Sequence, residues 1–252
     1  MMNNTVLSRA LPLIGLLMFL GIWEAVPLLG LAQRVLLPTP SDLPAAFMRE
    51  LSSGIWLKSV GQSLFHYVLG LAVGTGVGVG LGIATGMSRV AEGLFAWVSR
   101  LLRPIPGLAW VPFAIIWFGV SEGGAVFIIA IGVFWIVYFA TFGAIRSVDR
   151  DLVEVAQAFG FHGPFERLWK VLLPAATPGI LVGARTALGQ AWMAVVAAEL
   201  FGVSGLGSRM MQASSLLATD IVVVYMLTMA ALYGLMDTVF MLVQGRLLQW
   251  RP

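Results

Sequence analysis

The chain has 252 residues, of which 59% are hydrophobic and 11% are charged, and its mean hydropathy is +0.93. This composition excludes an ordinary soluble globular protein and predicts one polytopic membrane domain over residues 1–252. Cysteine is absent, which excludes disulfides, a cysteine-type zinc site and a thiol nucleophile. The sequence pI of about 9.7 does not indicate nucleic-acid binding, because the fifteen Lys and Arg residues are spread between apolar runs.

The first apolar run covers residues 11–31 and is long enough to cross ~30 Å of hydrocarbon at ~1.5 Å per residue. Arg9 stands before it, as in a signal peptide, but Trp23 and Glu24 interrupt the run and no small-residue cleavage site follows. We therefore expect a retained first span. Glu24 should face protein or the membrane interface, because a carboxylate in lipid costs at least ~2.5 kcal/mol.

Glycine recurs at every fourth position of the second span, residues 60–87. The glycines of this stripe are Gly70, Gly74, Gly78, Gly82 and Gly86. Helices without side chains at such positions can approach closely, and helix association in lipid depends on this packing. We expect the stripe to lie against another helix of the bundle or against a second subunit, since it never gives the G-x-G-x-x-G of a dinucleotide-binding loop. His66 is expected to be satisfied at the membrane interface.

Proline interrupts the chain at two places. A polar interval at residues 34–58 contains Pro-Thr-Pro at 38–40, which enforces an extended turn ahead of a short helix. The third span, residues 93–119, should be discontinuous or kinked, and such breaks are tolerated at membrane depth where they line a cavity or pack within protein. Its prolines are Pro104, Pro106 and Pro112. The fourth span follows at residues 124–145.

Residues 149–174 combine charges with a helical period. Asp151 can cap a helix start, and an apolar stripe follows at the spacing i, i+3, i+4, i+7. The stripe consists of Leu152, Val155, Ala156 and Phe159. Gly160 should end this helix in the left-handed conformation, and a second short helix is predicted from Pro164 to Pro174. Two amphipathic helices with a glycine corner present a surface suited to a partner protein.

The last two spans, residues 178–200 and 221–244, carry ionisable side chains. Arg185 either extends to the nearer membrane surface or lines a route across the membrane as a counter-charge, and Glu199 should lie near the opposite interface. An intramembrane carboxylate such as Asp237 is a candidate for a functional role. A helix–helix hydrogen bond, for example with Arg185, is an equal alternative for Asp237.

Positive charge predicts the orientation, because six spans put both termini on one side of the membrane. That side receives ten Lys and Arg residues: Arg9, Arg89, Arg100, Arg103, Arg146, Arg150, Arg167, Lys170, Arg246 and Arg251. The opposite side receives four: Arg34, Arg49, Lys58 and Arg209. The excess predicts cytoplasmic termini and a cytoplasmic 149–174 segment.

Several segments together resemble one family. Six residues resemble the EAA loop of permease subunits of bacterial ABC importers: Glu154, Ala156, Gly160, Leu172, Leu173 and Pro174. Val155 replaces the usual first alanine, and the interval from Gly160 to Pro174 is one residue longer than usual, which we place between the two helices. Other segments are similar to the nitrate/sulfonate/taurine branch, namely residues 36–40, 103–122, 183–199, 202–207 and 219–222. The chain departs from that branch at His66, where arginine is usual.

This resemblance implies an all-α membrane protein of six transmembrane helices, a type I ABC importer-like permease with a cytoplasmic coupling-helix loop at residues 149–174. It also implies a homodimer in the bacterial inner membrane, two ABC ATPase subunits and an external substrate-binding protein. The implied ATPase-coupling residues are Glu154, Ala156, Gly160, Phe161, His162, Leu173 and Pro174. Candidates for the translocation pathway are Trp110, Arg185, Trp192, Glu199 and Asp237.

Neither a catalytic residue, a metal site nor a cofactor is expected in this chain. Its two lysines, Lys58 and Lys170, do not follow glycine as in a phosphate-binding loop, so ATP–Mg should bind the partner ATPase. An intramembrane enzyme is disfavoured, because His66 and His162 are expected on opposite sides of the membrane and neither HExxH nor GxSxG occurs.

The resemblance implies import of a small anion or zwitterion of the nitrate, bicarbonate, aliphatic sulfonate or taurine type. A heterocyclic vitamin precursor stays open, because members of the family also carry such compounds. An ion-coupled secondary transporter is a further alternative, because four ionisable residues are candidates for a relay: Glu24, Arg185, Glu199 and Asp237.

Overall fold

A computed structural model describes residues 3–249 of the chain, with side chains from residue 11 onward. Over this part of the chain the secondary structure is entirely helical, which confirms the predicted all-α class. Five of the described helices are long and apolar enough to cross a membrane, and a bent helix pair provides a sixth candidate.

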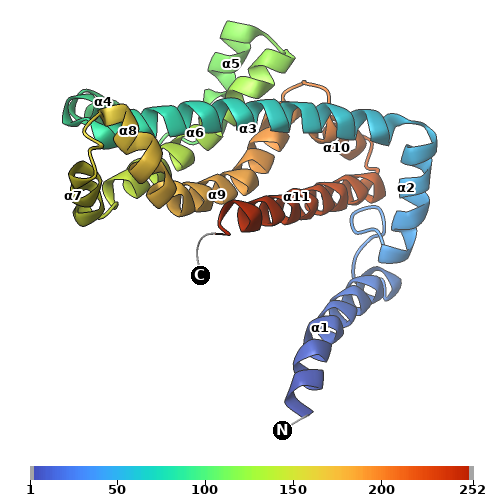
Figure 1. Ribbon diagram of the computed structural model, residues 1–252. Coiled ribbons are helices and arrows are strands. Elements are labelled where there is room, and N and C mark those ends of the chain that lie inside the picture. Colours follow the sequence, from blue (N-terminus) through green and yellow to red (C-terminus); the bar gives the residue numbers. More distant parts are fainter. Residues whose placement is uncertain (1–2, 250–252) are drawn as a thin grey trace. The chain divides into compact units, whose positions relative to one another are not determined.

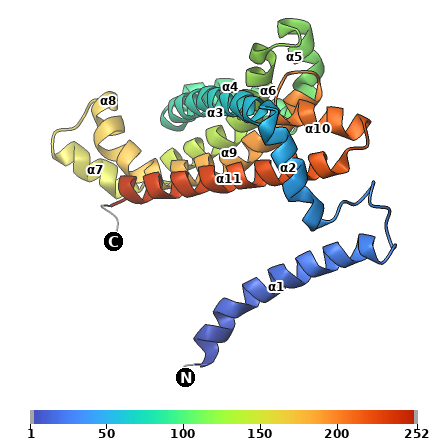
Figure 2. The ribbon, with the colours of Figure 1, turned by 90° about the vertical axis from the view of Figure 1, so that its right-hand side faces the viewer.

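The helices follow one another along the chain, and the longest connection between them lies between α1 and η1 (Figures 1 and 2). Their bounds are α1 Asn3–Leu28, η1 Pro40–Asp42, α2 Leu43–Ser52, α3 Ile55–Met87, α4 Arg89–Leu102, η2 Gly107–Trp110, α5 Val111–Phe118, α6 Glu122–Arg146, α7 Arg150–Ala158, α8 Pro164–Arg167, the π-helical turn η3 Leu168–Leu172, α9 Leu173–Leu200, α10 Leu206–Ser215 and α11 Thr219–Leu247. The chain divides into two compact units, one of Met1–Val60 with Arg209–Thr228 and one of Gly61–Ser208 with Met229–Pro252.

A buried carboxylate organises the first unit. Glu50 on α2 is 4% exposed, and it accepts hydrogen bonds from Arg209 Nε (3.0 Å), Arg209 Nη2 (2.6 Å) and the Tyr225 hydroxyl (2.8 Å). The Arg209 guanidinium holds the pKa of Glu50 below its usual range, although burial acts in the opposite direction. Because Arg209 belongs to α10 and Tyr225 to α11, this single carboxylate joins three helices.

The carboxylate of the first span is also partnered within the first unit. Glu24 accepts hydrogen bonds from the Ser41 amide (3.1 Å) and the Ser41 hydroxyl (2.7 Å). The indole of the preceding Trp23 donates to the Pro38 carbonyl at 2.9 Å. Glu24 therefore faces protein, and η1 holds the end of α1.

In the second unit, α3 packs on α6 through the glycine stripe. A Cβ atom added at Gly74 would stand 2.5 Å from the Ala130 carbonyl oxygen, whereas Gly76 on the other face has nothing within 4 Å. The remaining stripe residues Gly70, Gly78, Gly82 and Gly86 meet α6 in the same way. Of the two partners left open by the sequence, the structure shows a helix of the same bundle.

The third predicted span is bent. α4 and the η2–α5 pair form an angle of 91° about the break at residues 103–106, where Pro104 and Pro106 lie. A Cβ atom added at Gly107 would lie 3.3 Å from Gly132 Cα, so the chain after the break approaches α6 closely. The expected discontinuity thus places irregular backbone against protein, where its polar groups can be satisfied.

The prediction that a helix ends at Pro174 is wrong. α8, η3 and α9 form one helical run over Pro164–Leu200, so the expected start of the fifth span at Thr177–Pro178 lies inside α9. Pro174 is tolerated because the π turn just before it relieves the clash that a proline ring makes with the carbonyl four residues earlier. The interval from Gly160 to Pro174 is one residue longer than the usual spacing, and we expected this residue in the loop between the two helices. A π turn holds one residue more than an α turn, so the π turn at Leu168–Leu172 is a second place for it.

Candidate translocation cavity and coupling surface

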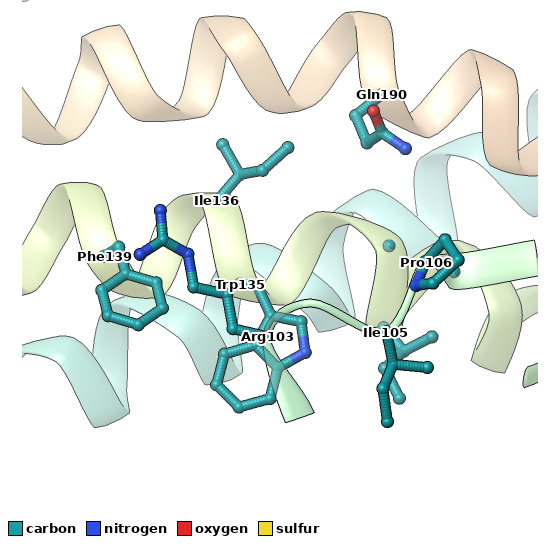
Figure 3. A pocket seen from close by; sticks show the side chains of 10 residues that line it. Arg103, Ile105, Pro106, Trp135, Ile136, Phe139 and Gln190 are labelled. Carbon is teal, nitrogen blue, oxygen red and sulfur yellow. The ribbon is translucent and has the colours of Figure 1, made fainter. Parts of the chain in front are cut away.

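A cavity of about 440 Å³ lies in the second unit where the break between α4 and η2 faces α6 and α9 (Figure 3). Its lining comes from three elements that the proline break brings together. These residues are Arg103, Ile105, Pro106, Gly107, Ile131, Gly132, Trp135, Ile136, Phe139 and Gln190.

Arg103 is the one ionisable side chain of this lining, and its guanidinium carbon lies 4.4 Å from the centroid of the Phe139 ring. None of the ion pairs found among the described side chains includes Arg103. Phe139 precedes Arg146, the last residue of α6, by about 10 Å of helix. Arg103 therefore lies beside the last turns of α6 rather than beyond its end.

Two neutral polar side chains also belong to the lining. The indole Nε1 of Trp135 is buried, has no hydrogen-bond partner among the described residues and lies on the Ile105 side of the ring in Figure 3, so the ring and not this nitrogen contributes to the cavity surface. Gln190 on α9 contributes a side-chain amide. The cavity therefore offers one cation and one amide to a small ligand.

A second cavity of about 410 Å³ adjoins the first along α6, and the two share Arg103 and Phe139. It is lined by Glu92, Ala96, Ser99, Arg100, Arg103, Tyr138, Phe139 and Phe142. Its one carboxylate, Glu92, is paired with Arg146. The two cavities thus follow α6 toward its C-terminal end, with Arg103 at their junction.

The five residues proposed from sequence for the pathway do not line either cavity. Arg185 and Asp237 instead form a two-bond pair, with Nε to Oδ1 and Nη2 to Oδ2 distances of 2.8 Å. Trp192 is buried and stacks on Tyr67, with ring centroids 4.7 Å apart, and Trp110 packs among aromatic rings of α5 and α6. Of the two roles left open for Asp237, the structure shows the helix–helix hydrogen bond.

Glu199, the fifth candidate, belongs to a buried polar cluster. Its carboxylate accepts hydrogen bonds from the Ser63 hydroxyl (2.7 and 2.8 Å) and the Gly207 amide (2.8 Å), and it lies 2.9 Å from His66 Nδ1. Ser63, His66 and Glu199 are each 0% exposed. His66 Nε2 also pairs with Glu122, the first residue of α6, so both ring nitrogens of the histidine are partnered.

The cluster holds a cation-capable side chain between two carboxylates. A neutral imidazole has one N–H and one acceptor nitrogen, so contacts with Glu199 and Glu122 at both ring nitrogens require an additional proton in the cluster. The departure at His66 from the pattern that the sequence resembles was the one sequence signal at this cluster.

The proposed ion relay has no continuous path within the second unit. Arg185 and Glu199 both lie on α9, fourteen residues or about 21 Å apart, and each is engaged by a separate partner. This arrangement does not favour the ion-coupled transporter.

Residues 149–174, the candidate coupling segment, begin with a capped helix and turn at a glycine. Asp149, not the expected Asp151, is the N-cap of α7, and its side chain accepts the Asp151 amide at 3.1 Å. Gly160 has φ +90°, a conformation in which side chains are rarely accommodated. The chain then enters α8, and Figure 1 shows α7 and α8 at the end of the second unit where α4 lies.

The apolar stripe of α7 is divided between the interior and the surface. Ala156 is 7% exposed, whereas Phe159 is 77% exposed. The other exposed large apolar side chains of the segment are Leu152, Val155, Phe165 and Trp169. Among the remaining coupling candidates, Glu154, Gly160, His162 and Pro174 are exposed, and Phe161 and Leu173 are half-buried. This concentration of apolar side chains has no cover within the described part of the chain.

An all-helical bundle with candidate membrane spans, cavities along one span and an uncovered helical segment at one end fits a membrane transport permease. Residues 74–251 match the family model of the binding-protein-dependent transport system inner membrane component. The chain belongs to this family.

Similar proteins agree with the branch indicated by the sequence. The chain is 36% identical over 233 residues to the putative aliphatic sulfonates transport permease protein SsuC of Escherichia coli, covering 92% of this chain and 88% of that protein. It is 33% identical to the taurine transport system permease protein TauC of Escherichia coli, over 97% and 91%, and 30% identical to the bicarbonate transport system permease protein CmpB of Synechococcus elongatus, over 78% and 74%.

Solved structures support the fold. A chain from inward-facing conformations of the MetNI methionine ABC transporter is similar with a TM-score of 0.62 at 19% identity, over 77% of this chain and 94% of that one. An amino acid ABC transporter chain gives a TM-score of 0.61 at 16% identity, over 78% and 94%. The predicted type I importer-like permease fold is therefore confirmed.

Proposed function

We propose that this chain is the permease subunit of an ATP-driven importer for a small anion or zwitterion, with aliphatic sulfonates and taurine as the first substrates to test. The names of the relatives, which concern aliphatic sulfonates, taurine and bicarbonate, support this class. The cavity supports it physically, because the one charged side chain of its lining is the cation of Arg103.

The energy source in this proposal is a partner ATPase that binds ATP–Mg, so the chain itself is no enzyme. One observation supports an ATPase partner: the large apolar side chains of residues 149–174 are uncovered, and Phe159 is the most exposed of the α7 stripe. An exposed apolar patch of this kind marks an interaction surface. Closing two ATPases on ATP would draw two such segments together, one from each permease of a homodimer.

The continuity of α8, η3 and α9 provides the mechanical link. The same helical run that starts in the coupling segment carries Gln190 of the cavity and Glu199 of the buried cluster. A displacement of its first turn is therefore transmitted along about 40–55 Å of helix rather than absorbed in a loop. Opening toward an external binding protein would follow ATP binding, and hydrolysis would reset the permease.

The orientation in this proposal places both termini and residues 149–174 in the cytoplasm. Ten Lys and Arg residues on that side against four on the other support this orientation. Arg251 lies outside the residues that the structure describes, as does the side chain of Arg9.

Reconstitution tests the proposal. The chain is incorporated into liposomes with its ATPase, and uptake of ³⁵S-labelled taurine or ethanesulfonate is measured with the binding protein outside and ATP inside. Uptake should need all three proteins and ATP. Equal uptake by the chain alone, driven by an ion gradient, would contradict the importer function.

A further inference from the structure

The backbone of residues 202–208, here called the 202–208 loop, lies directly on the buried carboxylate of Glu199. The Gly207 amide donates to Glu199 Oε2 at 2.8 Å. A Cβ atom added at Gly205 would stand 2.2 Å from the carboxylate carbon of Glu199, so the backbone lies too close to the carboxylate for any side chain at this position. The loop therefore covers the carboxylate and also supplies one of its hydrogen bonds.

The cluster under this loop holds one proton more than a neutral imidazole and two carboxylates supply. The Ser63 hydroxyl accepts from the Leu206 amide at 2.8 Å, so its own proton is donated to Glu199. His66 faces Glu199 with Nδ1 and Glu122 with Nε2. Without the additional proton, one ring nitrogen would present a lone pair to a carboxylate oxygen. The proton is shared and belongs to the cluster rather than to one residue.

Glu122 connects this proton with the surface of the chain. His66 and Glu199 are 0% exposed, whereas the side chain of Glu122 is 55% exposed and stands at the first residue of α6. The proton therefore exchanges through Nε2 of the imidazole and the Glu122 carboxylate.

The charge balance of the cluster depends on its own members. In the described part of the second unit, Glu122 and Glu199 are the charged side chains that face His66. Neither α5, nor the connection from α5 to α6, nor the 202–208 loop contains a charged residue. On α3 the neighbouring Tyr67 is neutral, and its hydroxyl donates to a backbone carbonyl of α9 at 3.3 Å.

We propose that this cluster is a proton-binding latch: with its proton bound it holds the 202–208 loop closed over Glu199, and loss of the proton at alkaline pH releases the loop. Without the proton, a carboxylate that is 0% exposed has no cationic partner. An unpaired buried charge is strongly unfavourable, and this cost is relieved when water reaches the carboxylate. Of the segments around Glu199, the loop is the one outside the long helices, so its displacement disturbs the bundle least. The latch involves neither substrate nor ATPase and goes beyond the proposed function.

Electron paramagnetic resonance of a spin label in the loop tests the latch on the full chain in nanodiscs. Ser204 is exposed and the chain has no cysteine, so Ser204→Cys provides a single attachment point. We expect the mobile fraction of the label to rise roughly threefold or more between about pH 6 and about pH 9, a range that spans the ordinary titration of histidine. The same label at Leu94→Cys, which is 78% exposed on α4, should show no such rise.

Two neutral substitutions in the Ser204→Cys chain identify the group that titrates. His66→Gln cannot supply a cation and should give the high mobile fraction at both pH values. Glu122→Gln removes one of the two carboxylates that stabilise the proton, so the rise in mobility should begin at lower pH. Its side chain is exposed, so the bundle should stay folded. Glu166→Gln, an exposed carboxylate of residues 149–174, is the matched control and should leave the midpoint unchanged.

Several results would overturn the latch. These are an equal mobile fraction at both pH values with His66 in place, a pH-dependent rise that persists in His66→Gln, and a low mobile fraction of His66→Gln throughout. An equal rise at position 94 would show that the whole bundle loosens, which also contradicts the latch. A midpoint that Glu122→Gln leaves unchanged would contradict the assignment of Glu122 to it. None of these results bears on the importer function, which the uptake assay tests separately.

Discussion

The buried cluster around Glu199 allows a quantitative test of what holds α3, α6 and α9 together. Replacing His66 by leucine removes the one cation-capable partner of a carboxylate that is 0% exposed. The Ser63 hydroxyl and the Gly207 amide remain as neutral donors, so the carboxylate is not stripped of all partners. Breaking a buried ion pair by removing one partner typically costs about 3–5 kcal/mol. The two remaining hydrogen bonds favour the lower part of this range.

A loss of about 3 kcal/mol should lower the melting temperature by roughly 6–12 °C for a chain of this size. Thermal unfolding in detergent, followed by intrinsic tryptophan fluorescence, measures this shift. His162→Leu is the matched control, because His162 is exposed in the coupling segment and surface substitutions usually change stability by less than about 0.5 kcal/mol. Equal melting temperatures for His66→Leu and wild type would refute the reasoning that His66 neutralises a buried carboxylate.

Three further predictions concern packing, pH and coupling. Gly74→Ala should destabilise the bundle by about 1–3 kcal/mol in the same unfolding assay, because the added Cβ meets the backbone of α6. Gly76→Ala is the control and should not destabilise it, because nothing lies within 4 Å of that Cβ. Similar effects at both positions would contradict the α3–α6 contact. The pKa of Glu50 lies below its ordinary value of 4.5, so its stabilising effect is complete above that pH and is lost as the pH falls through the folded-state pKa. Melting temperature should therefore fall more steeply below pH 4.5 in wild type than in Glu50→Gln, and parallel profiles would count against the Glu50 network. Gly160→Glu forces a side chain into a left-handed conformation at a cost of about 1–2 kcal/mol and should weaken co-purification of the ATPase from a folded bundle. Undiminished ATP-driven uptake by this variant would argue against a coupling role.

The helical class, the glycine stripe and the break in the third span could be predicted because each depends on local pattern. Four-residue spacing of glycine places all five residues on one helix face, and Pro104 and Pro106 interrupt a helix wherever they stand. Gly160 belongs with these, since its role depends on its own backbone conformation. The prediction that a helix ends at Pro174 was wrong because the outcome depends on the conformation of the preceding turn and not on the proline alone. Its ring is accommodated by a π turn, a feature with no simple sequence signature.

The cavity and the buried cluster depend on contacts between distant parts of the chain. His66 and Glu199 are 133 residues apart, and nothing local indicates that they meet. Arg103 was counted among the charges of the cytoplasmic side, and only the structure shows that the proline break places it over Phe139 of α6. Arg185 and Asp237 were singled out because they are charged residues within predicted spans, and the structure shows that their side chains form two hydrogen bonds with each other.

Accessibility of position 159 tests the central claim most directly, namely that residues 149–174 form a cytoplasmic surface for a nucleotide-driven partner. The chain has no cysteine, so Phe159→Cys introduces a single thiol. The account predicts that a membrane-impermeant maleimide labels this thiol in inside-out vesicles but not in right-side-out vesicles or intact spheroplasts, and that the bound ATPase protects it. Labelling from the outer side, or labelling in inside-out vesicles that the ATPase leaves unchanged, would contradict the account.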